Sequence, residues 1–361
     1  MSNQPSCTRT LAPQLPLRLA VVIPCYRVTR EILEVLARLG PEVEAIYCVD
    51  DACPEGSGTF IEQHCRDPRV RVLRHGQNQG VGGASLTGFC QALTDGAVIV
   101  AKIDGDGQMD PAMLPRIIQP ILSGRADYTK GNRFISLETV QQMPAVRLLG
   151  NAALSFLSKF SSGYWNIFDP TNGYVAIHTA ALRELPLPKL HRRYFFESDL
   201  LFRLNTIGAV VEDVPMNANY GTERSHLRVT RVLLPFLFKH LVNTAKRIAY
   251  NHYLRNFSAA SAELLTGLLS LVFGLSFGVA RWMGSIDSGV PVTAGTVMLA
   301  ALPVLVGVQL LLSFLNHDVR SVPHIPLHQR LGSPAPPQEP PPATATARES
   351  SDRSPGPILD Y

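Results

Sequence analysis

The N-terminal part of the chain alternates between short apolar runs and segments of helical periodicity. The apolar runs lie at 19–26, 43–51, 70–75 and 97–104. Amphipathic segments separate them, at 29–39, 58–65 and 83–96. Apolar strands joined by helices at this spacing predict βαβ units around a mostly parallel sheet, whose ligand site lies outside the carboxyl ends of the strands. The expected fold class is therefore α/β.

Two long apolar stretches change this pattern in the C-terminal third. Residues 264–280 and 289–315 contain no charged side chain and span 17 and 27 residues, so both can cross a hydrocarbon core about 30 Å thick. Basic residues flank the two outer ends, namely Arg228, Arg231, Lys239, Lys246, Arg247, Arg255, Arg320 and Arg330. The positive-inside rule therefore predicts a multi-pass protein of an inner, plasma or ER-type membrane, with the N-terminal domain and the C-terminal tail in the cytosol.

The segment before the first span mixes apolar and basic side chains at helical spacing. We expect amphipathic helices lying on an anionic leaflet; the alternative is a helix packed on the soluble domain. Beyond about residue 333 the chain is proline-rich, which predicts disorder. The expected organisation is a flexible N-terminus at 1–16, a domain at 17–225, juxtamembrane helices at 226–258, two transmembrane helices at 259–318 and a cytosolic disordered tail at 319–361.

Composition and charge exclude some classes of function. The chain has 361 residues, of which 46% are hydrophobic and 17% charged, so it is too apolar to be disordered as a whole. Its formal net charge is only +4, which argues against a dedicated nucleic-acid binder. The six cysteines show neither C-x-x-C nor metal-finger spacing and are typical of reduced thiols on the cytosolic side of a membrane.

A group of carboxylates directly follows the fourth apolar run, in the sequence KIDGDGQMDP. A calcium loop beginning at Asp104 would need glycine at its sixth position and glutamate at its twelfth, where this chain has Met109 and Pro115. Mg²⁺ or Mn²⁺ fits better, because these cations accept one or two carboxylates and take other ligands from phosphate and water. The alternative is a polar turn whose aspartates cap a helix that begins near Pro111.

Polar residues lie at the ends of three predicted strands. They are Pro24, Tyr26, Asp50, Asp51, Asp104 and Asp106. Because the carboxyl ends of parallel strands meet at one edge of a sheet, this convergence favours a ligand crevice over helix capping alone. The glycine-rich stretch NQGVGGASLTG at 78–88 does not match the dinucleotide fingerprint, since Ser85 stands where its last glycine is needed.

Taken in order, these motifs resemble the family 2 glycosyltransferases with a GT-A fold, a Rossmann-like and mostly parallel α/β domain. The matching stretches are VVIPCY, VDDACPEGSG, NQGVGGA, KIDGDGQMDP, KGNRF and FDPTNGY, followed by the amphipathic region and the two spans. Within the family, the chain is similar to the polyprenyl-phosphate glycosyltransferases related to dolichyl-phosphate mannose synthase. The resemblance implies inverting transfer of a sugar from a UDP- or GDP-sugar to undecaprenyl or dolichyl phosphate, with Mg²⁺ or Mn²⁺ as cofactor.

The resemblance also implies roles for individual residues on the donor side. Asp104 would lie near the ribose or the sugar, while Asp106 and Gln108 would hold the metal against the diphosphate. The residues expected around the nucleobase and ribose are Pro24, Tyr26, Asp50 and Asp51.

On the acceptor side, Arg133 and Arg147 match basic residues that the family places at a phosphate. Glu197 and Asp199 occupy the position where members with alcohol acceptors keep a base, and both are candidate catalytic residues. The residues that match the acceptor-loop motif are Asp169, Thr171, Asn172 and Gly173, with Asn172 standing where serine is usual.

The chemistry of the acceptor decides whether a base is needed. A sugar hydroxyl must lose a proton as it attacks, whereas a lipid monophosphate, with a second pKa of about 6, is already largely anionic near neutral pH. Such an acceptor needs shielding from the donor diphosphate, which Arg133, Arg147 and the metal would provide. Glu197 and Asp199 would then organise the arginines or cap a helix.

Other functions stay open at the level of sequence. A transferase that acts on a glycan or lipid hydroxyl would need a base at Glu197 or Asp199, and a processive synthase is disfavoured because its Q-x-x-R-W motif is reduced to GVARW. A non-catalytic scaffold that binds nucleotide sugars conflicts with the intact D-G-D-G-Q, and a transporter conflicts with spans that hold hardly any charge. The paired spans could also support a homo-oligomer.

Overall fold

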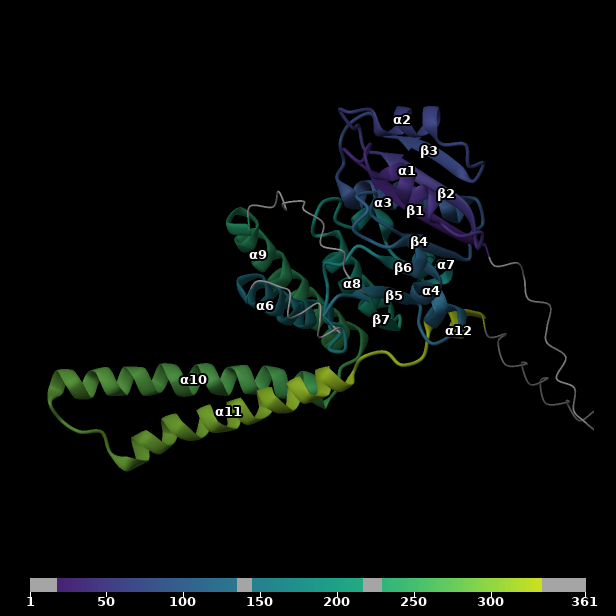
Figure 1. Cartoon of the computed structure of the whole chain (residues 1–361). Coiled ribbons are helices and arrows are strands. Elements are labelled where there is room, and N and C mark those ends of the chain that lie inside the picture. Colours follow the sequence, from purple (N-terminus) through teal and green to yellow (C-terminus); the bar gives the residue numbers. More distant parts are fainter. Residues whose placement is uncertain (1–17, 135–144, 217–228, 333–361) are drawn as a thin grey trace, which may run out of the picture. The chain divides into compact units, whose positions relative to one another are not determined.

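The computed structural model describes residues 18–134, 145–216 and 229–332. A seven-stranded sheet in the order β3-β2-β1-β4-β6-β5-β7 forms the centre of the N-terminal part (Figure 1). Its strands are β1 Leu19–Cys25, β2 Val43–Asp50, β3 Val70–Arg74, β4 Ile99–Lys102, β5 Tyr128–Asn132, β6 Val175–His178 and β7 Val211–Pro215. All four strands predicted from the apolar runs are present, each within a few residues of its expected bounds.

The sheet is mostly parallel, with one reversed strand. β1 pairs in parallel with β2 and β4, β2 with β3, and β5 with β7, whereas β6 runs antiparallel to both β4 and β5. The prediction of a mostly parallel α/β domain is confirmed. The reversed β6 places Val175 opposite Lys102 of β4 on one side and opposite Lys130 of β5 on the other.

Helices cover both faces of the sheet. They are α1 Ile32–Ala37, α2 Ser57–His64, α3 Val81–Thr94, α4 Leu114–Leu122, α7 Thr179–Glu184 and α8 Phe196–Ile207. A further helix, α6 Ala145–Ser162, packs on α8. Side chains of α3, α7 and α8 belong to one hydrophobic core, and those of α1, α2 and α4 to a second. In β1, Ala20 and Val22 enter the first core while Val21 and Ile23 enter the second, because successive side chains of a strand point to opposite faces.

Two long helices follow the α/β part and pack against each other as a hairpin (Figure 1). α10 spans Ala259–Ser288 and α11 spans Ala294–Arg320, and only 11% of the most apolar stretch of each is buried. A core helix of a soluble protein would bury most of such a stretch, so these helices have the length, composition and exposure of membrane spans. Both extend beyond the apolar stretches seen in the sequence, and they approach closely where a Cβ on Gly307 would lie 2.9 Å from the carbonyl oxygen of Gly267.

The segment before the spans forms α9, Val229–Ile248, and a π-helical turn, Ala249–Arg255. One face of α9 packs on α6 and α8 and buries His240, Asn243 and Arg247. Its other face exposes large apolar side chains, among them Leu234 and Phe238. The packing alternative is therefore confirmed for one face, while the exposed apolar face keeps the amphipathic character that predicted a membrane-surface helix.

The chain returns to the α/β domain after the second span. α12, Leu327–Gly332, begins where Asp127 accepts hydrogen bonds from the backbone N–H groups of Leu327 and His328, at 2.7 and 2.8 Å. Arg330 donates to the carbonyl of Gly208 at 2.7 Å. This corrects the predicted disordered tail at 319–361: residues 319–332 complete α11 and form α12, because Asp127 supplies a buried cap. Residues 333–361, like 1–17, lie outside the described residues.

Candidate active site

Asp51, at the end of β2, organises the glycine-rich segment that leads into α3. Its two carboxylate oxygens accept hydrogen bonds from the backbone N–H groups of Gln79 and Gly80, at 2.8 and 2.7 Å. His75 Nδ1 lies 2.7 Å from the same carboxylate. Gly80 has a φ of +87°, which favours glycine. The motifs VDDACPEGSG and NQGVGGA thus meet at the carboxyl edge of the sheet, as the convergence of strand ends predicted.

The other donor-side candidates lie around this edge. Asp50 is buried and accepts hydrogen bonds from the N–H groups of Cys53 and Gly58, both at 2.8 Å. Pro24 is part of β1, and Tyr26 follows it with 44% of its surface exposed. Among these residues Tyr26 offers an accessible ring for stacking, whereas Asp50 and Asp51 shape the surrounding loops.

The D-G-D-G-Q turn follows β4 and offers two carboxylates. Asp106 Oδ1 accepts a hydrogen bond from the backbone N–H of Gln108 at 3.1 Å, and Gly107 has a φ of +72°. Within residues 18–134, 145–216 and 229–332, no three acidic, histidine or cysteine side chains form a metal-binding group. The two carboxylates of the turn, Asp104 and Asp106, fit Mg²⁺ or Mn²⁺, which bind through one or two carboxylates and complete their coordination with substrate phosphates and water.

Asp104 is tied to a buried lysine. Lys102 Nζ lies 2.7 Å from Asp104 Oδ1 and 3.4 Å from Glu197 Oε1, and the lysine side chain is fully buried. Burial alone would lower the pKa of Lys102, but the two carboxylates raise it above its ordinary value. Burial raises the pKa of Glu197, which Lys102 partly offsets. Glu197 therefore balances the charge of Lys102 beside the D-G-D-G-Q turn.

The segment 169–173 packs directly on this group. A Cβ on Gly173 would lie 2.5 Å from Asp104 Oδ2 and 2.6 Å from Lys102 Nζ, so any larger residue would push the segment away. FDPTNGY and KIDGDGQMDP, which are far apart in the sequence, are thus in contact.

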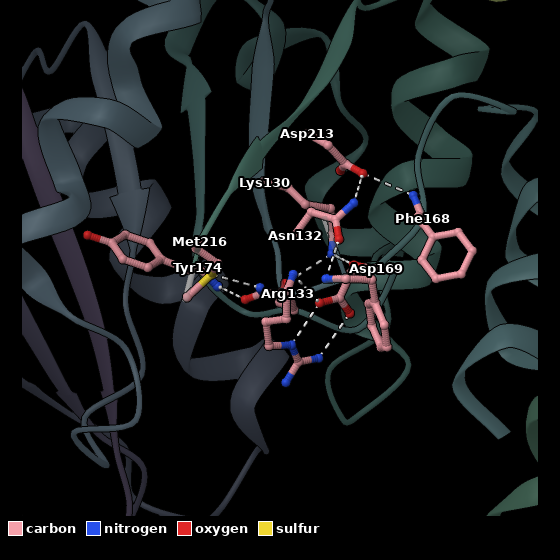
Figure 2. Close-up of polar contacts among 10 residues, drawn as sticks. Lys130, Asn132, Arg133, Phe168, Asp169, Tyr174, Asp213 and Met216 are labelled. Atoms are coloured by element: carbon pink, nitrogen blue, oxygen red, sulfur yellow. Dashed lines mark hydrogen bonds and ion pairs between the residues drawn. The ribbon is translucent and has the colours of Figure 1, made fainter. Parts of the chain in front are cut away.

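Arg133 is held at the other end of the same segment, as Figure 2 shows. Its Nε and Nη2 donate to the two oxygens of Asp169 at 2.7 and 2.9 Å. Burial would raise the pKa of Asp169, but Arg133 and Lys130 keep it below its ordinary value. The Arg133 side chain keeps 23% of its surface exposed.

A buried network of hydrogen bonds supports this segment from the protein interior (Figure 2). Asn172 Oδ1 accepts a hydrogen bond from the N–H of Tyr174 at 2.9 Å, and its Nδ2 donates to Met216 Sδ at 3.0 Å. Asp213 Oδ2 accepts hydrogen bonds from Asn132 Nδ2 at 2.6 Å and from the N–H of Phe168 at 3.0 Å. The amide of Asn172 therefore faces the protein and fixes the turn.

The structure does not bring every predicted residue to this place. Asp199 lies two residues after Glu197 on α8, yet its carboxylate accepts hydrogen bonds from the N–H of His191, from Arg203 Nε and from Asn243 Nδ2, at 3.0, 3.0 and 3.2 Å. It thus joins α8 to α9. Arg147 belongs to α6, but its side chain lies outside the described residues.

Two buried lysines are absent from the sequence-based set of site residues. Lys102 contacts Asp104, and Lys130 of β5 donates to the backbone carbonyls of Asp169 and Asn172. Burial lowers the pKa of Lys130 to about 8, although Asp169 and Asp213 oppose this shift. For Lys102, its position inside an otherwise apolar predicted strand was the available signal, since a buried charge needs a partner. No strand was predicted around Lys130.

Comparison with known proteins now identifies the class. The model of glycosyl transferase family 2 matches residues 20–186. A UDP-N-acetylglucosamine–dolichyl-phosphate N-acetylglucosaminyltransferase of Methanococcus voltae is 29% identical over 230 residues, which cover 60% of this chain and 91% of that protein. An undecaprenyl-phosphate mannosyltransferase of Micrococcus luteus is 30% identical, covering 55% and 83%. A polyprenol monophosphomannose synthase of Mycolicibacterium smegmatis is 31% identical, covering 55% and 76%.

The fold and the carboxylate-bearing strand ends define an α/β enzyme domain of the GT-A type, with a site at the carboxyl edge of its sheet. The chain belongs to glycosyl transferase family 2, and it is a glycosyltransferase.

Proposed function

We propose that this protein is a membrane-bound, inverting glycosyltransferase that moves a sugar from a nucleotide-sugar donor to a polyprenyl phosphate. The names of its relatives support this proposal, because each includes a polyprenyl-type lipid acceptor. The observation that carries the proposal is that both candidate bases already have partners within the fold. Glu197 is paired with buried Lys102, and Asp199 is occupied by three donors from other parts of the fold.

A phosphate acceptor fits such a site because it needs no base. A lipid monophosphate near pH 7 already carries a nucleophilic oxygen, its second pKa being about 6. Its attack forms a bond to the anomeric carbon while the bond from that carbon to the nucleoside diphosphate breaks, and no proton moves. Two anions must approach each other in this step, so a cation such as Arg133 would shield one from the other.

A divalent cation fits the D-G-D-G-Q turn. Asp106 and Gln108 would hold it, with Asp104 beside them, and either Mg²⁺ or Mn²⁺ suits the oxygen ligands. When bound, the ion would offset the charge that develops on the departing diphosphate. The contribution of the chain itself is to hold Asp104 in place through Lys102 and Gly173.

The contacts at the two ends of the hairpin indicate on which side of a membrane the α/β domain and α12 would lie. The π-helical turn before α10 and the α12 segment after α11 both contact the α/β domain, through Arg255 to the carbonyl of Thr206 at 3.0 Å and through Asp127. If α10 and α11 span the membrane, the domain and α12 therefore lie on the same side. The basic residues that flank both outer ends support a cytosolic location for that side.

The test is a transfer assay with the purified full-length protein in detergent. A panel of UDP- and GDP-sugars is offered with polyprenyl phosphate and, separately, with the matching polyprenol. We expect one or more donors to react with the phosphate and none with the alcohol. Transfer to the alcohol, or to neither, would contradict the proposal.

Amide variants test whether Asp199 or Glu197 acts as a general base. Asp199→Asn is expected to retain activity within about tenfold, because a true general base contributes roughly 10²- to 10⁴-fold. Glu197→Gln also changes the surroundings of Lys102, so its overall activity is not informative. For this variant the measurement is the preference for polyprenyl phosphate over polyprenol. A fall of several orders of magnitude in Asp199→Asn with an unchanged Tm would favour a hydroxyl acceptor.

A further inference from the structure

Two fully buried lysines lie under the segment that contacts the D-G-D-G-Q turn. Lys102 is the last residue of β4, and Lys130 belongs to β5. Both stand opposite Val175 of the intervening β6. Because residues in register across neighbouring strands point to the same face of a sheet, the two ammonium groups rise toward the same loop.

The partners of the two lysines are mainly backbone carbonyls of one segment. Lys102 Nζ donates to the carbonyl of Gly173 at 3.3 Å. Lys130 Nζ donates to the carbonyls of Asn172, at 3.3 Å, and Asp169. The segment 169–173 is thus held from below at three carbonyl oxygens, by two cations from two strands.

These contacts connect the donor and acceptor sides of the site. Lys102 also pairs with Asp104 of the D-G-D-G-Q turn. Lys130 donates to the backbone carbonyl of Asp169, and the carboxylate of Asp169 forms a bidentate pair with Arg133. Burial of an ammonium group carries a large desolvation penalty, and an apolar side chain of similar length would fill the same space, so packing alone does not explain either lysine.

We propose that Lys130 and Lys102 are positioning residues that fix the segment 169–173 against the D-G-D-G-Q turn and thereby place Arg133 at the acceptor phosphate. This inference rests on the proposed function. Lys130 touches only the acceptor side, so its loss affects acceptor binding. Lys102 touches both sides, so its loss affects donor and acceptor together.

The first experiment separates these effects by steady-state kinetics. In Lys130→Met we expect the KM for polyprenyl phosphate to rise about tenfold or more, with the KM for the donor within about twofold. In Lys102→Met we expect the KM for polyprenyl phosphate and the KM for the donor both to rise. The matched control is Arg69→Met, because Arg69 also donates to backbone carbonyls, those of Leu39, Gly40 and Val43, at the opposite edge of the sheet. It is expected to lower Tm without changing either KM.

The second experiment varies pH, first in the unsubstituted enzyme and then in Lys130→Arg. Burial lowers the pKa of Lys130 to about 8 among Asp169, Asp213, Glu197 and Arg133, whereas a phosphate monoester, with a second pKa of about 6, is already mostly dianionic at pH 7. Between pH 7 and 9 we expect the acceptor KM of the unsubstituted enzyme to rise as Lys130 loses its proton. Lys130→Arg should flatten this rise, because a guanidinium stays protonated throughout.

The outcomes distinguish the two levels of inference. An unsubstituted enzyme that does not use polyprenyl phosphate would overturn the proposed function. An active enzyme in which Lys130→Met leaves the acceptor KM unchanged, or lowers kcat alone, would overturn the positioning role. So would a pH-dependent rise in KM that persists in Lys130→Arg.

Discussion

At the scale of single residues, the site depends on which carboxylates are already engaged. Asp104 and Glu197 share Lys102, and Asp169 holds Arg133. Asp199 lies only two positions from Glu197, yet positions two apart on an α-helix point in nearly opposite directions, so it contacts α9. Neutralised carboxylates cannot act as bases without first giving up a buried partner. These pairings support the proposed phosphate acceptor, which needs no base.

The metal assignment can be tested at one residue with a matched control nearby. Asp106→Asn should lower transfer at least about a hundredfold and abolish the dependence of nucleotide binding on Mn²⁺ or Mg²⁺. Asp110→Asn is the control, since Asp110 belongs to the same stretch but pairs with Arg38 at 2.5 Å and caps the turn that begins at Pro111. Calorimetric titration of nucleoside diphosphate with and without chelator is the measurement. Metal-dependent binding that survives in Asp106→Asn would exclude this turn as the metal site.

At the scale of elements, a buried ion pair joins α9 to the end of the second long helix. Arg247 Nη1 and Nη2 lie 2.6 and 2.9 Å from the two oxygens of Asp318, and both side chains are only 2% exposed. Trp165 Nε1 donates to the same carboxylate at 2.9 Å, and His252 Nε2 lies 3.3 Å from it. The end of α11 is therefore attached by directional contacts to α9, to the π-helical turn and to Trp165.

Breaking this pair should destabilise the protein. Asp318→Ala leaves Arg247 buried without its partner, and we expect a loss of about 3–5 kcal/mol in the free energy of unfolding. The double variant Arg247→Met with Asp318→Leu should recover part of the loss, because it removes both buried charges. Thermal unfolding in detergent is the measurement. Equal stability of the single and double variants would show that the unpaired charge of Arg247 does not cause the loss in the free energy of unfolding.

At the scale of the whole molecule, the α/β domain and the hairpin have different roles in the proposed function. In the proposed function the domain would supply the site for a water-soluble donor, while α10 and α11 have the length and exposure to hold the domain at a bilayer. The exposed apolar face of α9, with Leu234, Phe238 and Leu241, would extend this contact along the membrane surface. Such an arrangement brings the enzyme to a lipid acceptor that never leaves the membrane.

The proposed orientation makes a prediction about labelling in intact cells. Val290 lies in the connector between α10 and α11 and is 65% exposed, whereas the native Cys90 is exposed on the α/β domain. A membrane-impermeant maleimide should label Val290→Cys from outside and reach Cys90 only after permeabilisation. Labelling of both from one side would show that the hairpin does not cross the membrane as proposed.

Much of the fold was predictable because it depends on local periodicity. The runs at 19–26 and 43–51 alternate or stay apolar over a strand's length, and 264–280 and 289–315 are long enough to span a bilayer. The candidate site followed from strand ends such as Asp51 and Asp104, which a parallel sheet gathers at one edge. Lys102 and Lys130 were missed because a single lysine in a run carries no sign of its partner.

By itself, the sequence determined four strands of the sheet, the helices between them and the two long apolar helices, since each depends on neighbours in the chain. The class of chemistry came from the ordered motifs that resemble family 2 glycosyltransferases. Only the tertiary structure decided which charges meet. The reversed strand β6 brings Lys102 and Lys130 under the segment 169–173, and α9 takes Asp199 away from Glu197. Electrostatic pairing depends on distances across the fold, and residues 71 or 95 positions apart, as in the bonds of Lys102 to Gly173 and Glu197, become neighbours only when the sheet has formed.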